Sequence, residues 1–182
     1  MKAPTILASV RTLPQRLEAG QFIRLYDEYY RRVYNYVRYR CGDAVIADDL
    51  TALTFEKALT RLADFDPDRG PFGAWLFTIA RNMVNNHLRS ERGRSWLPLE
   101  SCDEHPDQAA SPEESMIQGE AQAELLTALS QLSERDRDLL SLKFAAGLTN
   151  RRIAEMTGMT DNHVGVVLYR AIHRLKAILE VM

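Results

Sequence analysis

The chain has 182 residues, enough for one medium-sized domain or two small ones, each with its own core. Its formal net charge is only −2, so the total charge favours no class of partner. Two cysteines in unlike contexts exclude a disulfide framework and indicate a reduced environment. Arg11 interrupts the first apolar run, and no apolar stretch has the length of a membrane span. We therefore expect a soluble cytoplasmic protein without membrane insertion.

The charges are unevenly distributed along the chain. Residues 1–94 contain fifteen Lys and Arg against eleven Asp and Glu, and residues 135–182 contain eight against five. Between them, residues 95–134 contain nine acidic residues and no Lys or Arg. This pattern predicts two basic segments separated by an acidic one.

Two helices are predicted after a loose tail at residues 1–17. Apolar side chains recur at helical spacing from about 18 to 40. The residues with this spacing are Phe22, Tyr26, Tyr29, Val33 and Val37. Gly42 and Asp43 are expected to end this helix and to cap a second one over about 44–63. The second helix has an exposed acidic pair, Asp48 and Asp49.

A third helix follows a turn at residues 65–71, which hold two prolines and one glycine. One side of this helix is apolar, and Trp75 is interpreted as a core anchor. The other side carries Arg81, Asn82, Asn85, Asn86, Arg89 and Arg92. Asn is a poor helix former, so this cluster indicates a function such as hydrogen bonding to bases, although Asn also caps or cross-links helices.

The acidic stretch after Gly93 has little apolar content, and residues 96–111 are predicted to be a flexible linker. Ser111 and Pro112 then begin a helix that runs to about residue 132. Ser133 caps the next helix. We expect that helix to pack beneath the C-terminal motif through Leu139, Leu140, Leu142 and Phe144.

Residues 147–176 have the pattern of a helix-turn-helix. Thr149 is expected to cap a short amphipathic helix, and Gly158 supplies the positive φ that ends it. Thr160 or Asp161 caps a longer helix with one apolar stripe, formed by Val164, Leu168, Ala171, Leu175 and Ile178. Arg170, His173, Arg174 and Lys176 lie off that stripe, as expected for a helix that enters a DNA major groove. A plain structural hairpin has the same pattern.

Enzyme and metal-site signatures do not emerge from the sequence. Cys102 and His105 form an isolated pair without further ligands at suitable spacing, so no zinc site is predicted. The sequence has no nucleophile elbow, phosphate loop or paired-carboxylate motif. We expect no catalytic residues, no metal and no cofactor.

Two motifs resemble the extracytoplasmic-function (ECF) sigma factors. WLFTIARNMVNNHLR is similar to their signature WLxxIARN, and LSERDRDLLSLKFAAGLTNRRIAEMTGMTDNHVGVVLYRAIHRLK follows the spacing of their second domain. The resemblance covers about residues 22–180. It implies an all-α fold of two small helical domains, a sigma region 2-like bundle at 18–95 and a region 4-like helix-turn-helix domain at 112–182, joined by the acidic linker at 96–111.

The resemblance also implies partners and site residues. Such proteins bind bacterial core RNA polymerase, recognise promoter −10 and −35 elements, and are commonly held by an anti-sigma factor. The implied polymerase-binding residues are Asp48, Asp49, Leu50, Thr51 and Phe55. Those implied for the −10 element are Arg81, Asn82, Asn85, Asn86, Arg89, Arg92 and Arg94. Those implied for the −35 element are Arg151, Arg152, Asn162, His163, Val166, Tyr169, Arg170, His173 and Arg174.

The sequence departs from the family pattern in two places. Ala52 and Leu53 replace a Gln and an acid, and Gly165, Val166 and Val167 replace the usual Lys, Ser and Arg of the reading helix. Two other interpretations therefore stay open. One is a sigma-like decoy that sequesters an anti-sigma protein, and the other is a free-standing helix-turn-helix regulator. The linker is either a solvated tether or a segment that enters the basic RNA channel of the polymerase.

Overall fold

The computed structural model describes residues 19–93 and 112–182, and these residues form helices and turns without a strand. The first segment contains α1 (Ala19–Cys41), α2 (Ala44–Thr60) and α3 (Phe72–Gly93), with short turns η1 (Leu62–Asp64) and η2 (Pro67–Arg69) between the last two. The all-α prediction is confirmed. The linker predicted at 96–111 and the tail at 1–17 lie outside the described residues.

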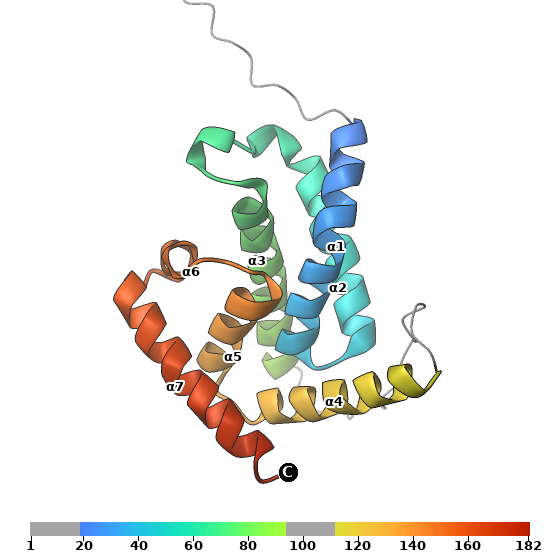
Figure 1. The fold of residues 1–182 in the computed structure, drawn as a ribbon. Coiled ribbons are helices and arrows are strands. Elements are labelled where there is room, and N and C mark those ends of the chain that lie inside the picture. The colour runs from blue at the N-terminus through green and yellow to red at the C-terminus, as the bar shows by residue number, and fades with distance from the viewer. Residues whose placement is uncertain (1–18, 94–111) are drawn as a thin grey trace, which may run out of the picture.

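The second segment contains α4 (Pro112–Ser130), α5 (Glu134–Leu140), the π-helical turn η3 (Ser141–Ala145), α6 (Asn150–Thr157) and α7 (Asp161–Leu179). In Figure 1, α1, α2 and α3 form one bundle, α6 and α7 lie on the opposite side of α5, and α4 runs along one end. None of the described helices is long and apolar enough to cross a membrane.

Side-chain caps set the helix starts that the sequence predicts. The Asp43 carboxylate accepts a hydrogen bond from the Ile46 amide at 2.8 Å, at the start of α2. Ser133, Thr149 and Thr160 play the same role for α5, α6 and α7. Each cap satisfies an amide that has no partner within its own helix. Gly158 has a φ of 72°, which ends α6 in the left-handed region and makes the turn.

The core is continuous through both segments. Tyr36 of α1 is fully buried and meets Phe77 of α3 edge to face, with the ring centroids 5.8 Å apart. Leu139 and Leu142 of the second segment belong to the same cluster of buried side chains. α1 contacts both α5 and η3, so the N-terminal bundle and the helix-turn-helix segment pack directly against each other.

The structure differs from the sequence prediction in a few places. Phe144, predicted to pack beneath the helix-turn-helix, is 63 % exposed. It lies in the π-helical turn η3, whose wider spacing shifts side chains out of the 3.6-residue register. The second helix ends at Thr60 rather than near 63, because a 3-10 turn follows. Trp75 is partly buried against Phe65 and Phe72, in agreement with the predicted core role.

Gly73 provides a test of the packing between α1 and α3. A Cβ at this position would lie 2.7 Å from Cε1 of Tyr29, whose ring also contacts Phe72 and Arg32. We expect Gly73→Ala to lower the free energy of unfolding by about 1–3 kcal/mol, as overpacking typically does. Denaturant unfolding followed by circular dichroism measures this change.

Gly119→Ala is the matched control, because Gly119 lies in α4 with nothing within 4 Å of its would-be Cβ. Removing a helical glycine there should raise the free energy of unfolding by up to ~1 kcal/mol. Equal changes in the two variants would contradict the close approach of Tyr29 to Gly73.

Candidate nucleic-acid interface

The predicted polymerase-binding residues of α2 divide between its surface and its core. Asp48 and Asp49 are exposed. Leu50, Thr51 and Phe55 are buried, with 7 %, 0 % and 4 % of their surface exposed. The prediction that these three side chains contact the polymerase directly is therefore corrected. They belong to the core, because α2 turns them toward α1 and α3. The outward surface of α2 includes the two carboxylates with Ala52 and Leu53.

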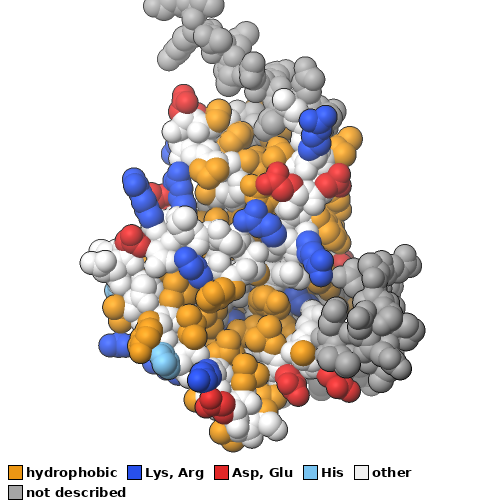
Figure 2. Space-filling view, viewed as in Figure 1, with side chains coloured by type: hydrophobic (Ala, Val, Ile, Leu, Met, Phe, Trp, Pro, Cys, Tyr) orange, Lys and Arg blue, Asp and Glu red, His pale blue; other side chains and the backbone are white. Residues whose placement is uncertain are grey.

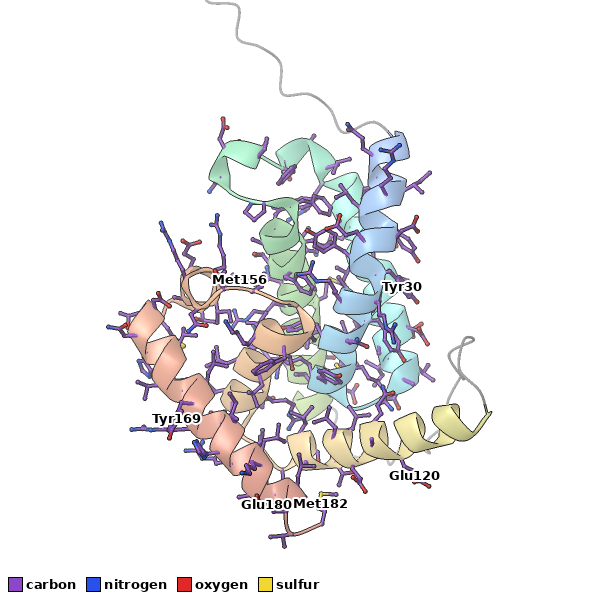
Figure 3. All side chains as sticks on the ribbon, viewed as in Figure 1. Tyr30, Glu120, Met156, Tyr169, Glu180 and Met182 are labelled. Carbon is purple, nitrogen blue, oxygen red and sulfur yellow. The ribbon has the colours of Figure 1, made fainter. Side chains whose placement is uncertain are left out.

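An aromatic row on α1 supports the acidic face of α2. Tyr26 packs on Phe55 with the ring centroids 4.7 Å apart, and Tyr30 stacks on Phe55 and Tyr34. Burial, together with the neighbouring Asp48 carboxylate, raises the pKa of Tyr30. Tyr30 therefore keeps its proton at neutral pH and can donate a hydrogen bond to the neighbouring carboxylate. Figure 3 labels Tyr30 on α1.

The polar residues of α3, predicted as one set, lie on two faces of the helix. Asn82, Asn86 and Arg89 are exposed to solvent and follow helical spacing. Arg81 and Asn85 lie one turn apart on the other polar face and are partly buried. The side chains of Arg92 and Arg94 lie outside the described residues. Only the first of the two faces is open to a nucleic acid in this structure.

The second face of α3 is engaged by the C-terminal segment. Arg81 Nε donates to Asp138 Oδ2 at 2.8 Å, and its Nη1 donates to the Met156 carbonyl at 3.1 Å. Met156 is labelled in Figure 3, where α6 approaches α3. Asn85 Oδ1 accepts from Arg40 Nη2 at 3.0 Å, so this amide cross-links α3 and α1. Asn85 therefore cross-links two helices in the packed form, and its contact with the −10 element stays a prediction.

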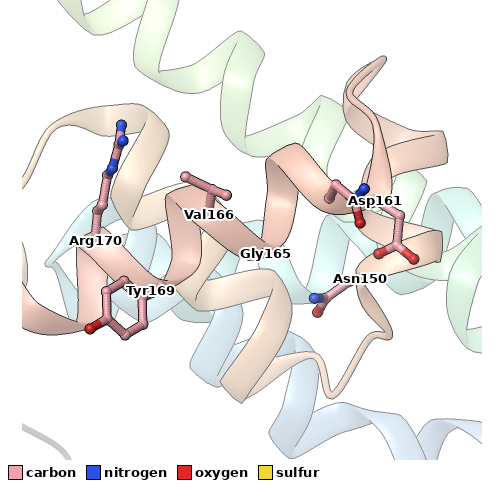
Figure 4. A pocket seen from close by; sticks show the side chains of 7 residues that line it. Asn150, Asp161, Gly165, Val166, Tyr169 and Arg170 are labelled. Atoms are coloured by element: carbon pink, nitrogen blue, oxygen red, sulfur yellow. The ribbon is translucent and has the colours of Figure 1, made fainter.

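Exposed side chains of the helix-turn-helix gather on one face of α7. Val166 is 49 % exposed and Tyr169 is 65 % exposed. In Figure 4, Val166, Tyr169 and Arg170 project from α7, whereas Asn150 and Asp161 lie at the other end of a shallow hollow that passes Gly165. Asn162 and His173 are exposed as well. A Cβ at Gly165 would make only ordinary contact, 3.7 Å from Asn150 Nδ2, so internal packing does not require glycine there.

Several cations predicted for the −35 element have partners within the chain. Arg151 and Arg152 both pair with Glu155 within α6, at 3.3 and 2.7 Å, and the hydrogen bond from Arg152 lowers the pKa of the Glu155 carboxyl. Arg174 pairs with the buried Asp136 of α5. The Arg151–Glu155 pair is exposed, and such pairs are weak and easily rearranged, so it does not prevent contact with phosphate.

His163 has a partner that the sequence pattern did not indicate. Its Nε2 lies 2.9 Å from Arg135 Nη2, at the start of α5. Other residues missed from the sequence are Asn150 and Asp161, which line the hollow, and Arg40, which lies inside the packed form. The only signal for Asn150 and Asp161 was their place at the first turns of α6 and α7. Arg40 had no such signal, because α5 supplies its partner from far along the chain.

The cations are dispersed on the face shown in Figure 2. Lys and Arg side chains of the described residues are scattered there, and hydrophobic side chains gather between them in the lower half. Tyr169 points away from the helical bundle in Figure 3, beside His173, with the ring centroids 4.4 Å apart. The reading face of α7 thus combines aromatic and apolar groups with a few cations, a composition that suits contact with base edges and methyl groups.

Two family models match this chain and define its class. Residues 25–94 match the family model described as Sigma-70 region 2, and residues 122–175 match Sigma-70, region 4. These regions occur in the order that the sequence predicts. Members of this class are DNA-binding factors for transcription initiation and not enzymes.

The relatives then give the family. The chain is 35 % identical to the ECF RNA polymerase sigma factor BldN of Streptomyces coelicolor, over 94 % of this chain and 66 % of that protein. It is 30 % identical to the ECF RNA polymerase sigma factor SigL of Mycobacterium tuberculosis, over 90 % and 91 % of the two chains. The chain therefore belongs to the ECF RNA polymerase sigma factor family.

A solved structure agrees with this assignment. The sigma factor RpoE of Bartonella quintana, in complex with the anti-sigma factor NepR, superposes with a TM-score of 0.70 at 25 % identity. The match covers 89 % of this chain and 98 % of that one. The arrangement of both helical segments is thus shared with a solved sigma factor.

Cys41, at the end of α1 and near Arg137 of α5, tests how well the packing of the two segments buries its thiol. Burial raises the pKa of its thiol to about 11, although the nearby Arg40 and Arg137 act in the opposite direction. At pH 8 about 0.1 % of the thiol is then ionised, against roughly a quarter of a free cysteine with a pKa near 8.5. In a Cys102→Ser background, we expect iodoacetamide to alkylate native Cys41 about two orders of magnitude more slowly than the urea-unfolded chain.

The rate should also rise about tenfold per pH unit up to pH 11, because only the thiolate reacts. Mass spectrometry of timed samples measures it. A native rate equal to that of the unfolded chain would show that Cys41 is not buried.

Proposed function

We propose that this protein is a promoter-specificity factor that binds bacterial core RNA polymerase in the cytoplasm and directs initiation at promoters with −10 and −35 elements. The observation that carries this proposal is the presence of sigma region 2 and sigma region 4 matches, in order, on one chain. The activity needs contacts with core polymerase, the −10 element and the −35 element. The exposed groups of α2, α3 and α7 supply one surface for each of them.

The polymerase contact is assigned to the outward face of α2. Asp48 and Asp49 are exposed there, and Leu53 is 44 % exposed beside them. Carboxylates next to apolar surface suit a partner whose docking element is basic, because charge complementarity speeds and orients association. Leu50, Thr51 and Phe55 contribute indirectly, since they hold this helix against the core.

The −10 contact is assigned to the solvent face of α3. Asn82 and Asn86 offer amides that both donate and accept hydrogen bonds, and Arg89 offers a cation one turn further. Such groups suit an unpaired strand, whose base edges need hydrogen bonds and whose phosphates need cations. The same proposal includes Arg92 and Arg94, whose side chains lie outside the described residues.

The −35 contact is assigned to α7, supported by α6. Arg170 and His173 supply polar groups beside Tyr169, and the Val166 methyl groups suit a thymine methyl. Arg151 and Arg152 at the start of α6 are proposed to supply cations for the flanking phosphates. Gly165 leaves the hollow on α7 open, so a base edge can approach the helix backbone closely.

An anti-sigma factor is proposed as the regulatory partner. The solved relative from Bartonella quintana is itself in complex with one. The same proposal includes two domains, a region 2-like domain at 18–95 and a region 4-like domain at 112–182. An anti-sigma factor that binds both domains would need a separate surface on each.

A decoy that sequesters an anti-sigma protein is the second candidate, favoured by Gly165, Val166 and Val167 in place of polar reading residues. The two candidates differ in transcription. Transcript starts mapped after overproduction of the protein identify its promoters, and run-off assays with purified core enzyme then measure initiation. The factor should give initiation well above core enzyme alone, whereas a decoy should give none.

The acidic face of α2 can be tested by charge removal. We expect the double variant Asp48→Asn and Asp49→Asn to weaken binding to core polymerase by about 2- to 30-fold, since each exposed ion pair contributes about 0.2–1 kcal/mol. Asp64→Asn is the matched control, because Asp64 is exposed in η1, outside α2. Fluorescence anisotropy titrations measure the dissociation constants. An equal loss of affinity in Asp64→Asn would contradict the assignment of the polymerase contact to this face of α2.

The reading helix can be tested through the salt dependence of promoter binding by the holoenzyme. We expect Arg170→Gln to reduce the slope of log affinity against log salt by about 0.9, as the loss of one phosphate contact does. Lys176→Gln is the control, because Lys176 lies in the last turn of the same helix, beyond Val166, Tyr169 and Arg170. An unchanged slope in Arg170→Gln would exclude a phosphate contact by this arginine.

A further inference from the structure

A buried carboxylate joins the two segments of the chain. Asp138 of α5 is only 6 % exposed. Tyr36 donates its hydroxyl to Asp138 Oδ1 at 3.0 Å, and Arg81 Nε donates to Oδ2 at 2.8 Å. Arg40 Nε lies 3.2 Å from Oδ1. All three partners belong to the N-terminal bundle, so this one carboxylate faces a polar pocket made by the other segment.

The pocket has more positive charge than Asp138 neutralises. It contains two guanidinium groups, and Arg40 is only 3 % exposed. Although Arg40 Nε is close to the carboxylate, it has no hydrogen-bond partner among the described residues. A buried donor without a partner costs free energy, so the fit between this pocket and a carboxylate is incomplete.

The same groups suit a nucleic-acid phosphate. Two guanidiniums and a tyrosine hydroxyl are donors that converge on one anion, and guanidinium groups bind phosphate oxygens well. Arg81 and Asn85 are one turn apart on α3, the helix proposed to contact the −10 element. A phosphate has more acceptor oxygens than a carboxylate and can therefore satisfy the remaining Arg40 donor.

We infer that Arg40 and Arg81 form a phosphate-binding site for promoter DNA, and that Asp138 occupies this site in the packed form of the protein. The inference extends the proposed function, since it adds Arg40 to the −10 contact and gives the free chain an internal inhibitor. Asp138 and a DNA phosphate exclude each other, so DNA binding at this site requires the two segments to separate.

Further contacts keep the site covered. Arg81 Nη1 donates to the Met156 carbonyl of α6, and Arg40 Nη1 donates to the Glu134 carbonyl of α5 at 3.3 Å. Arg32 donates to the Ala146 carbonyl just after η3. In Figure 1, α5 and α6 lie beside α3 and α1, the helices to which these arginines belong. Separation of the segments releases these contacts together and exposes the whole site.

The test compares the full-length chain with its Asp138→Asn variant, without polymerase. Asn has the shape of Asp but no charge, so the variant should favour separated segments. Fluorescence anisotropy with a labelled oligothymidine measures binding, because a phosphate site does not depend on base sequence. We expect the variant to bind about 5- to 150-fold more tightly, the usual range of coupling between linked equilibria.

The salt dependence identifies the groups involved. One additional phosphate contact should make the slope of log affinity against log salt steeper by about 0.7 on a single strand. Adding Arg40→Gln to the variant should reverse most of that change, because one arginine alone binds the phosphate less well. Small-angle X-ray scattering should show a larger radius of gyration for Asp138→Asn than for the wild type.

Asp136→Asn is the matched control. Asp136 is also a buried carboxylate of α5, but it pairs with Arg174 of the same segment. In an Arg174→Gln background, which lacks the cation that Asp136 would release, its removal should leave DNA affinity, slope and radius of gyration unchanged. If Asp138→Asn fails to fold by circular dichroism, Asp138→Ser also removes the carboxylate and leaves every donor of the phosphate site in place, and it should tighten binding in the same direction.

A folded Asp138→Asn variant with wild-type affinity and slope would overturn the inference, as would expansion of the chain without tighter binding. An effect of Asp136→Asn as large as that of Asp138→Asn would overturn it as well. The proposed function fails separately, by an absence of initiation in run-off assays. Tighter DNA binding and a steeper salt slope in Asp138→Asn support the phosphate site whether or not the run-off assays show initiation.

Discussion

The packing of the two segments depends on the burial of one charged group. Removing a carboxylate from water is costly, and the cost is offset only where cations and hydrogen-bond donors surround it closely. Asp138 meets this condition through groups of α1 and α3, so α5 can approach these helices in only one register. Buried ion pairs contribute little net stability, but a wrong register would leave several charges unpaired. The arrangement of α6 and α7 follows from that of α5.

The local features of the fold could be predicted from the sequence, because they depend on residues a few positions apart. Thr149 and Thr160 each cap a helix through the amide three residues on. Gly158 ends α6 because the left-handed region is easily reached by glycine. Helical spacing likewise identified the buried stripe of Val164, Leu168 and Ala171. The class of protein followed from these elements together with two sequence motifs.

The site could be predicted only in part, because its remaining features depend on contacts between distant residues. Tyr36 and Asp138 are 102 positions apart, and Arg81 is 57 positions from the same carboxylate. Helical periodicity does not indicate such pairs, so Arg81 and Asn85 were grouped with Asn82 and Asn86. Arg81 in fact contacts the second segment, and Asn85 contacts Arg40 of α1. The burial of Thr51 and Phe55 was missed for the same reason. Phe144 was misplaced because a π-helical turn has no sequence signature of its own.

The ends of α3 and α4 also limit how far apart the two segments can act. Gly93 and Pro112 are the last and first helical residues, and eighteen residues lie between them. A fully extended chain spans about 3.3–3.6 Å per residue, which gives a reach of roughly 60–65 Å. Duplex DNA rises about 3.4 Å per base pair, so this reach corresponds to roughly eighteen base pairs. If the chain contacts both promoter elements as proposed, the length of residues 94–111 sets an upper limit on the distance between its two anchor points on DNA.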